Sequence, residues 1–436
     1  MNKRNIFLTI LCIVLGCLSA SSVELKKINL DDAIQLSLEN NLDIQAARID
    51  VELAKNSVKL ANKLNNPDLN LFFNYGQAGK NEPQQIGVSE LFEIGKRSPR
   101  KQLAKANLVQ KELAVKSAEF TLEMDVRETY ADLVAAKTIL SSLLEQEKLL
   151  KDLYEIANKR YAQKKSPLSE SLQVQIVLNN LSVSINNAQT ALIHARNEFN
   201  KALNIKDNKD FSFDTQEDYL PDETVFISLK TPDYTKDMVE FSRVEQLVLP
   251  KRYDIQIAKQ DVSVAEKKLK LVSKEIIPDL EVFGGYSYLS SSHTENNVHK
   301  SGAYVAASIK NIPLFNTGKQ DVENAKLSLK QAQINYESLN NKALKDLNSA
   351  YDKLMTSQKN LKFYKNKLVK DSEDLLKEAK KDYIEGHTDL TSVIVMAQSY
   401  REIYNGYISA LADYYTDWID FLREVCIEDF SWEEML

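Results

Sequence analysis

The chain has 436 residues, of which 43% are hydrophobic and 27% charged, so it can bury a core and is not a disordered polymer. Its formal net charge of −6 argues against a nucleic-acid partner, because phosphate binding depends on a positive field. With only 11 glycines and 9 prolines, the usual residues of turns, the sequence predicts long uninterrupted elements.

The first 22 residues have the pattern of a secretory signal peptide. Lys3 and Arg4 precede an apolar run from 6 to 18, and small residues follow at 19–22. A membrane anchor is the weaker alternative, because this run is shorter than the roughly 20 residues that cross a bilayer. We therefore expect cleavage near Ser22 and export of the mature chain.

Two cysteines lie inside this leader. Residues 14–17 are similar to a lipoprotein cleavage box, in which lipid would be attached to Cys17. Leu15 fits that box poorly and the small residues at 20–22 offer a competing site, so lipidation of Cys17 is the minority interpretation. After cleavage at 20 or 22 only Cys426 remains, which excludes a disulfide framework.

A long helix is predicted after residue 100. Neither Gly nor Pro occurs from 100 to 166, and the segment is rich in good helix formers. Some 65 residues would reach about 100 Å. Apolar residues recur there at alternating steps of three and four, which indicates coiled-coil packing: Leu133, Ala136, Leu140, Leu143, Leu150, Tyr154, Ala157 and Tyr161.

The chain is internally duplicated. Residues 43–45 (Asp-Ile-Gln) recur at 254–256, and residues 67–69 (Pro-Asp-Leu) recur at 278–280, both at an offset of 211. Leu-Phe and Gly-Lys at 91–92 and 95–96 also recur, at 314–315 and 318–319. The expected organisation is a signal peptide (1–22), a first repeat (23–203), a connector (204–250), a second repeat (251–420) and a C-terminal tail (421–436).

Each repeat is expected to contain a medium helix, a β-hairpin, a long helix, a sharp break and another medium helix. In the first repeat the medium helices are expected at about 31–64 and 167–203. In the hairpins the apolar period changes to two, which predicts strands with one apolar and one polar face. The apolar set is Leu69, Leu71, Phe73 and Tyr75, Ile86 and Val88, Leu280, Val282, Tyr286 and Tyr288, and Ala303, Val305, Ala307 and Ile309.

The pattern predicts how the chain would span a membrane. No apolar run of 20 follows the leader, but strands of about 10 residues can span as a closed barrel. Four strands cannot close alone and eight would leave a filled interior, so three chains with twelve strands are the smallest open assembly. We expect an α+β membrane protein with a trimeric 12-stranded transmembrane β-barrel, continued by an α-helical coiled-coil tunnel.

The whole mature chain resembles the TolC family of outer-membrane efflux proteins. The resemblance rests on residues 30–34 leading to 39–42, on both Pro-Asp-Leu sequences and on residues 314–318. It implies a homotrimer in outer-membrane lipid, with a periplasmic tunnel that docks a periplasmic adaptor (membrane fusion) protein and an inner-membrane efflux pump. Residues 91–97, with Arg100 and Ala104, are most similar to the heavy-metal cation branch of that family.

Enzymatic and metal chemistry are not expected. The sequence has no nucleophile elbow, phosphate-binding glycine loop or zinc signature, so neither a catalytic site nor a cofactor is predicted. The four histidines, at 194, 293, 299 and 387, are scattered without ligand spacing. A passive exit duct is therefore the expected function, and the alternatives are a periplasmic coiled-coil scaffold or an adaptor protein without a barrel.

The helix breaks are the candidate functional site. The Tyr-x-x-Gly of the family's tunnel tip is present as Tyr383 and Gly386, whereas the first repeat has Lys164 where glycine is expected. We expect Pro167 to make the first break. Reversing turns expose groups that a partner can bind. The candidate adaptor-docking residues are Arg160, Tyr161, Lys164, Pro167, Asp382, Tyr383, Gly386 and Asp389.

Overall fold

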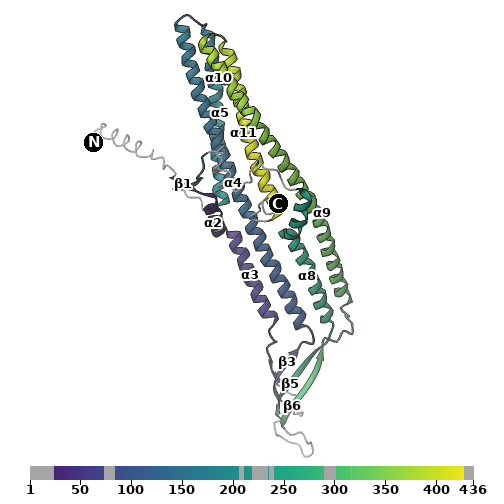
Figure 1. Ribbon diagram of the computed structural model, residues 1–436. Helices are drawn as coiled ribbons and strands as arrows, with labels where there is room; N and C mark the ends of the chain where they lie inside the picture. The colour runs from purple at the N-terminus through teal and green to yellow at the C-terminus, as the bar shows by residue number, and fades with distance from the viewer. Residues whose placement is uncertain are drawn as a thin grey trace, which may run out of the picture. The chain divides into compact units, whose positions relative to one another are not determined.

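The computed structural model describes residues 24–72, 84–205, 211–218, 234, 240–288, 301–315 and 317–426 (Figure 1). The chain forms two compact units, neither of them continuous in sequence. We call them the sheet unit (45–117 and 249–343) and the tip unit (1–44, 118–248 and 344–436). Each unit therefore contains segments of both sequence repeats.

The sheet unit contains a four-stranded antiparallel sheet of order β2-β3-β5-β6. Two hairpins, one from each repeat, are joined by the pairing of β3 with β5. Its elements are most of α3 (Leu42–Ala61), β2 (Asp68–Phe72), β3 (Gln84–Phe92), η1 (Leu249–Lys251), α8 (Tyr253–Glu275), β5 (Asp279–Tyr288), β6 (Gly302–Lys310) and the first parts of α4 (Arg97–Ala162) and α9 (Lys319–Phe363).

Two glycines allow the central strands to carry an aromatic ring on one face. Gly87 and Gly285 lie opposite each other in register, and Tyr304 of β6 follows in the same row. A Cβ atom on Gly87 would lie 2.6 Å from the Tyr304 hydroxyl, and one on Gly285 would lie 2.8 Å from it. Both positions therefore require glycine while the tyrosine side chain covers them.

The tip unit is a packed set of long helices. It contains β1 (Glu24–Ile28), α2 (Leu30–Asn40), α5 (Leu168–Ala202), β4 (Phe211–Thr215), α7 (Phe241–Val248), the π-helix η2 (Tyr364–Val369), α10 (Lys370–Glu385), α11 (Leu390–Val425) and the remaining parts of α4 and α9. One cluster of its core is formed by apolar residues of four helices: Leu143, Leu150, Leu153 and Ala157 of α4, Val174, Leu181 and Ile185 of α5, Tyr383 of α10, and Leu390 and Val393 of α11.

The long helices confirm the sequence prediction. Helix α4 has 66 residues and is about 100 Å long. In the second repeat, α9, η2 and α10 follow one another without a gap from 319 to 385. The predicted coiled-coil positions on α4 are buried or half-buried up to Ala157, whereas the last of them, Tyr161, is exposed.

The helix expected at 31–64 is two helices, and the prediction of one was wrong. Asn41 separates α2 from α3, and its side-chain oxygen accepts hydrogen bonds from the backbone N–H groups of Asp43 (2.9 Å) and Ile44 (3.0 Å). This capping contact satisfies donors that a helix start leaves free, so the asparagine stabilises a break. At the other end of the chain α11 continues to Val425, which includes the first residues of the expected tail.

Strands β1 and β4 form a parallel pair that the sequence analysis did not predict. Glu24 opposite Phe211 and Ile28 opposite Thr215 define the register. The pair joins the start of the described chain to the segment expected to be the connector, 187 residues further on. Parallel strands so far apart leave no local sequence signal, because no hairpin turn joins them.

Candidate functional site

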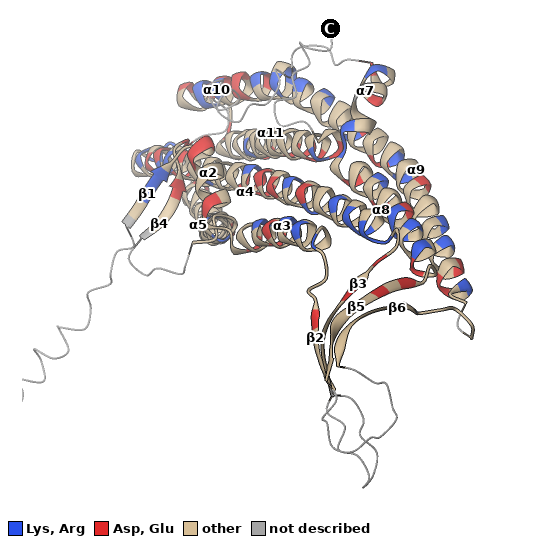
Figure 2. Ribbon diagram, turned by 90° about the horizontal axis from the view of Figure 1, so that it is seen from below, with Lys and Arg blue, Asp and Glu red and all other residues tan. Residues whose placement is uncertain are grey.

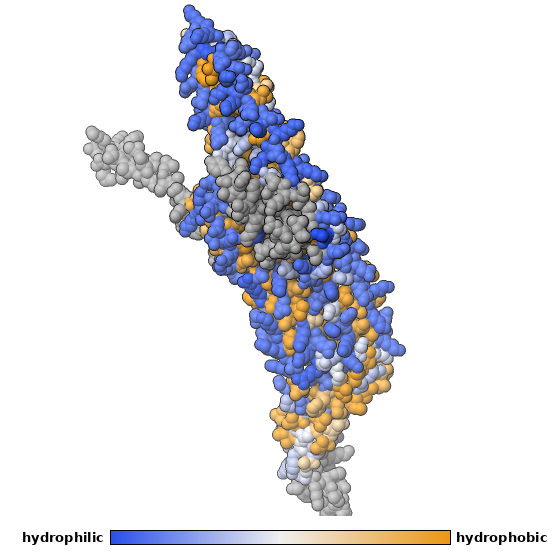
Figure 3. Space-filling model, in the orientation of Figure 1, coloured by the Kyte–Doolittle hydropathy of each residue, from blue (hydrophilic) through white to orange (hydrophobic). Residues whose placement is uncertain are grey.

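One face of the four-stranded sheet is apolar and exposed. Residues that lie opposite each other on neighbouring strands share a face of the sheet. The strand register places the predicted apolar residues on one face, which confirms the predicted alternation of apolar and polar side chains. Val305 is 83% exposed and Leu69 65%. Figure 3 shows hydrophobic side chains gathered over this sheet. The described members are Leu69, Leu71, Ile86, Val88, Leu280, Val282, Tyr286, Tyr288, Ala303, Val305, Ala307 and Ile309, whereas Phe73 and Tyr75 lie outside the described residues.

The opposite face carries polar contacts between neighbouring strands. The Asn70 side chain donates to the Ser89 hydroxyl at 2.8 Å. Ser308 donates to the Glu281 carboxylate at 3.3 Å, and Lys310 lies 2.9 Å from the same carboxylate. Charged residues are few on β5 and β6 and frequent, with mixed sign, on the helices (Figure 2). The sheet is thus amphipathic: these polar contacts lie on one side, and the other side is mainly apolar, although it carries Glu90 of β3, which lies opposite Val282.

The two helix tips end in the same backbone motif. Gly386 has φ +86°, its N–H donates to the Tyr383 carbonyl at 3.1 Å, and the next N–H donates to the Asp382 carbonyl at 2.8 Å. At the first tip Lys164 has φ +59° and donates to the Tyr161 carbonyl at 2.8 Å. Lys165 likewise donates to the Arg160 carbonyl at 2.9 Å, so both ends are Schellman-type caps.

The prediction that Pro167 makes the first break was therefore wrong. The helix has already ended at Ala162, and Lys164 adopts the left-handed conformation in which glycine is usual. Pro167 is instead the N-cap of α5 and makes no side-chain capping bond. Asp389, its counterpart at the second tip, accepts from the Ser392 N–H at 2.8 Å. Hydrogen bonds from the Ser392 hydroxyl and from this N–H hold the pKa of the Asp389 carboxyl below its ordinary value.

Tyr383 joins the two tips within the chain. Its ring is 1% exposed and lies 4.6 Å from the Arg160 guanidinium, which also donates to the Tyr383 carbonyl at 2.5 Å. The Tyr383 hydroxyl donates to the Glu170 carboxylate at 3.1 Å. Burial, together with the charge and the hydrogen bond of Glu170, raises the pKa of Tyr383 to about 12. The first-repeat counterpart, Tyr161, is 45% exposed.

The candidate tip residues thus divide into two groups. Arg160 and Tyr383 contact each other, and Glu170 completes their contact although the sequence analysis did not select it. Tyr161, Lys164, Pro167 and Gly386 lie on the exposed turns. Asp382 contributes a backbone carbonyl and Asp389 a capping carboxylate. Cys17, the candidate lipidation site, lies outside the described residues.

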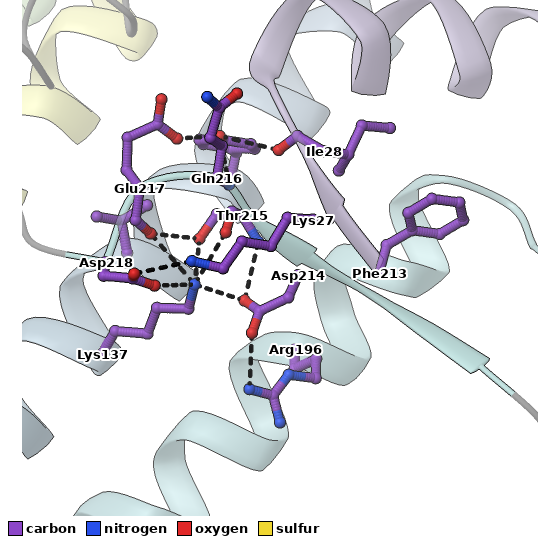
Figure 4. Close-up of polar contacts among 12 residues, drawn as sticks. Lys27, Ile28, Lys137, Arg196, Phe213, Asp214, Thr215, Gln216, Glu217 and Asp218 are labelled. Atoms are coloured by element: carbon purple, nitrogen blue, oxygen red, sulfur yellow. Dashed lines mark hydrogen bonds and ion pairs between the residues drawn. The ribbon is translucent and has the colours of Figure 1, made fainter. Parts of the chain in front are cut away.

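A polar cluster at the β1–β4 pair was missed by the sequence analysis (Figure 4). The Lys137 ammonium group lies 2.7 Å from the Asp214 carboxylate, and both side chains are about 10% exposed or less. It also donates to the Thr215 hydroxyl at 2.8 Å and to the Thr215 and Glu217 carbonyls. Nearby, the Tyr130 hydroxyl donates to the Glu217 carboxylate. The cluster fixes β4 against α4.

The part of the chain that the structure describes contains neither a membrane-spanning helix nor a metal-binding cluster. None of the helices described is both long and apolar enough to cross a membrane. No group of three or more His, Cys, Asp or Glu side chains in the described part of the chain could hold a metal ion. His293 and His299 lie outside the residues that the structure describes.

The sequence model of the family described as outer membrane efflux protein matches residues 33–204 and 244–419, which together are most of the chain. This chain belongs to the outer membrane efflux protein family. The resemblance to TolC-type proteins is thereby confirmed, as is an outer-membrane location. A search of curated proteins found no match.

Solved structures share the fold of this outer membrane efflux protein at low sequence identity. CusC is 17% identical with a TM-score of 0.71, covering 92% of this chain and 93% of its own. The Campylobacter jejuni CmeC outer membrane channel is 17% identical with a TM-score of 0.69, covering 94% and 90%. The open state of the Neisseria gonorrhoeae MtrE outer membrane channel is 15% identical with a TM-score of 0.70, covering 91% and 88%.

Proposed function

We propose that this outer membrane efflux protein is the exit duct of a tripartite export system. Three copies form a twelve-stranded barrel in the outer membrane, and their helices form a tunnel in the periplasm. The duct is a passive conduit for substrates that an inner-membrane pump delivers through a periplasmic adaptor. Membership of the family sets aside a coiled-coil scaffold or an adaptor as the alternative.

The amphipathic sheet is the observation that carries this proposal. Its apolar face is too large and too exposed for a protein surrounded by water, and such a face is typical of a lipid or protein interface. The edge strands β2 and β6 each have one neighbour among the described residues. Because a lipid-exposed sheet cannot leave its edges unpaired, closure must come from other copies.

The tips are the part of the duct that we propose docks the adaptor. Lys164 and Gly386 make the two turns, and exposed apolar side chains lie beside them: Tyr161, Leu168 and Ile384. Exposed aromatic and aliphatic groups beside a lysine form a surface that a helical partner can contact. The Tyr383 contact holds the two turns in a fixed arrangement within one copy.

Docking is tested with Gly386→Val and Lys164→Glu. The first forces a branched residue into a left-handed turn with free space around it, and the second reverses the charge of an exposed turn. Both variants should reach the outer membrane as trimers but lose export and cross-linking to the adaptor. Lys201→Glu, at an exposed lysine near the other end of α5, is the control. Normal export by both tip variants would place docking elsewhere.

A further inference from the structure

The sequence duplication is also a duplication of structure, position by position. Seven buried residues of α9 each lie 223 residues after a buried residue of α4. The same offset relates Gly95 to Gly318, and both have positive φ before their long helix. The seven pairs are Phe120 and Ala343, Met124 and Leu347, Arg127 and Ala350, Ala131 and Leu354, Val134 and Ser357, Ala135 and Gln358, and Thr138 and Leu361.

Inside the sheet unit, the polar side-chain contacts that join the two repeats include an ion pair and a hydrogen bond between α4 and α8. Lys96, just before α4, pairs with Asp279, the first residue of β5, at 2.7 Å. These side chains are 11% and 5% exposed. The Gln110 amide of α4 donates to the Asp261 carboxylate of α8 at 2.5 Å. Between the same repeats, β3 pairs with β5.

The counterparts of all four residues have the same side chains. At the offset of 223, Lys319 corresponds to Lys96 and Gln333 to Gln110. At the offset of 211, Asp68 corresponds to Asp279 and Asp50 to Asp261. All four counterparts are exposed, and the Asp50 carboxylate lies 2.8 Å from the Lys111 ammonium group of α4.

We propose that these counterparts bind one another between two copies of this chain, Lys319 to Asp68 and Gln333 to Asp50. The inference rests on the proposed function and adds the residues and the strand register of its subunit interface. The second repeat of one copy contacts the first repeat of the next, as the first contacts the second within a chain. Such a head-to-tail contact uses two different surfaces, and it closes into the ring of the proposed function when the rotation between neighbouring copies is one third of a turn.

The strand edges fit the same arrangement. Ser89 and Lys310 occupy equivalent positions, because Ser89 lies opposite Asp68 and Lys310 lies opposite Asp279. Within one chain Ser89 lies opposite Phe283. At the offset of 211 the counterpart of Phe283 is Phe72, which lies on the edge strand β2. The predicted register therefore places Lys310 of β6 opposite Phe72 of a second copy, and it keeps the apolar faces of both sheets on one side.

Helix α3 presents the apolar surface that such an interface would bury. Ile49, Leu53 and Leu60 are each about 60% exposed, and their spacing of four and seven places them on one face. Their α8 counterparts, Gln260, Val264 and Leu271, are all partly buried in the chain, and Gln260 donates to the Ala106 carbonyl of α4. A second copy would thus cover α3 as α4 covers α8.

A charge exchange tests the ion pair. Asp68→Lys and Lys319→Asp should each weaken the oligomer by about 100-fold or more, because each leaves two like charges facing at a buried position. The double variant Asp68→Lys/Lys319→Asp should restore assembly to within a few-fold of wild type. The readout is the oligomer fraction of detergent-extracted protein against concentration. Failure of the double variant to recover, or full assembly of both single variants, would overturn the pairing.

Cross-linking distinguishes this inference from the proposed function. In a Cys426→Ser background, Asp68→Cys/Lys319→Cys treated with a short bismaleimide should give products of two and three chain masses. The matched pair Lys96→Cys/Asp279→Cys should cross-link within one chain. If the wild type is oligomeric but Asp68→Cys/Lys319→Cys gives only single-chain products, the proposed interface is wrong and the proposed function is unaffected. If the wild type is monomeric, the proposed assembly itself is wrong.

Discussion

The Lys137 cluster gives the sharpest stability prediction. Lys137→Met keeps the length of the side chain but removes its positive charge and its donors. The Asp214 carboxylate and the Thr215 and Glu217 carbonyls then each lose a hydrogen-bond donor. Asp214 keeps two partners, the Arg196 guanidinium at 3.1 Å and the Thr215 N–H at 2.8 Å. Asp218 keeps Lys27 at 2.8 Å. The substitution therefore leaves a buried, partly compensated carboxylate.

Lys137→Met should reduce stability by about 3 kcal/mol, which is the lower end of the range for breaking a buried ion pair. Because the contacts hold β4 against α4, the loss should appear as local opening of β1 and β4. A cost of about 3 kcal/mol corresponds to amide exchange roughly 100-fold faster in these strands. Hydrogen exchange followed by mass spectrometry measures it directly.

Lys151→Met is the matched control on the same helix. Lys151 pairs with Glu147 at 2.8 Å but is 60% exposed, and exposed pairs one turn apart contribute about 0.5 kcal/mol or less. Exchange should therefore change no more than about threefold. If Lys137→Met and Lys151→Met leave β1 and β4 equally protected, the cluster does not hold the strand pair and the reasoning is refuted.

Three further predictions concern the sheet and the tips. Val305→Arg should impair membrane insertion, since a cation on a lipid-facing strand costs about 2–4 kcal/mol near the bilayer midplane. Ser308→Arg, on the opposite face, should insert normally. Equal tolerance of both variants in a membrane-fractionation assay would show that the two faces are misassigned. Lys164→Gly should stabilise the first turn by about 1 kcal/mol, because glycine adopts the left-handed conformation without strain. The gain should appear as slower proteolysis at this turn. An unchanged rate would mean that Lys164 is not strained. Tyr383→Phe should lose the bond to Glu170 and loosen the tip by about 1 kcal/mol. In wild type the pKa of Tyr383 is raised, so the stability contributed by its bond to Glu170 is complete below pH 10 and is lost as pH rises through about 12. A probe of tip mobility that shows no loosening between these pH values would count against the contact.

Sequence periodicity predicted the parts of the fold that depend on local pattern. The alternation on β6 fixes which side chains share a face, because a slip of one residue would exchange both faces of the strand. The long helix α4 follows from 66 residues of good helix formers, with the one proline in the first turn, where a missing donor costs little. The duplication predicted two hairpins of the same kind, and the structure contains both.

The features that were missed depend on contacts between distant segments or on single residues in unusual conformations. Lys137 is one of many lysines on a charged helix, and only the folding of 211–218 against it marks it as buried. The left-handed turn at Lys164 contradicts residue preference, so tertiary contacts such as that of Arg160 with Tyr383 must compensate for it. Asn41 was a readable signal, since a cap residue between two helical stretches favours a break.

The mass of the assembly tests the central claim most directly. The protein should be extracted from the outer-membrane fraction in mild detergent and its native mass determined with the bound detergent accounted for. Because the described residues of one chain form a four-stranded sheet whose edge strands, β2 and β6, each have one neighbour, the account predicts a complex of three copies. A stable monomer or dimer that stays folded in the same detergent would contradict it.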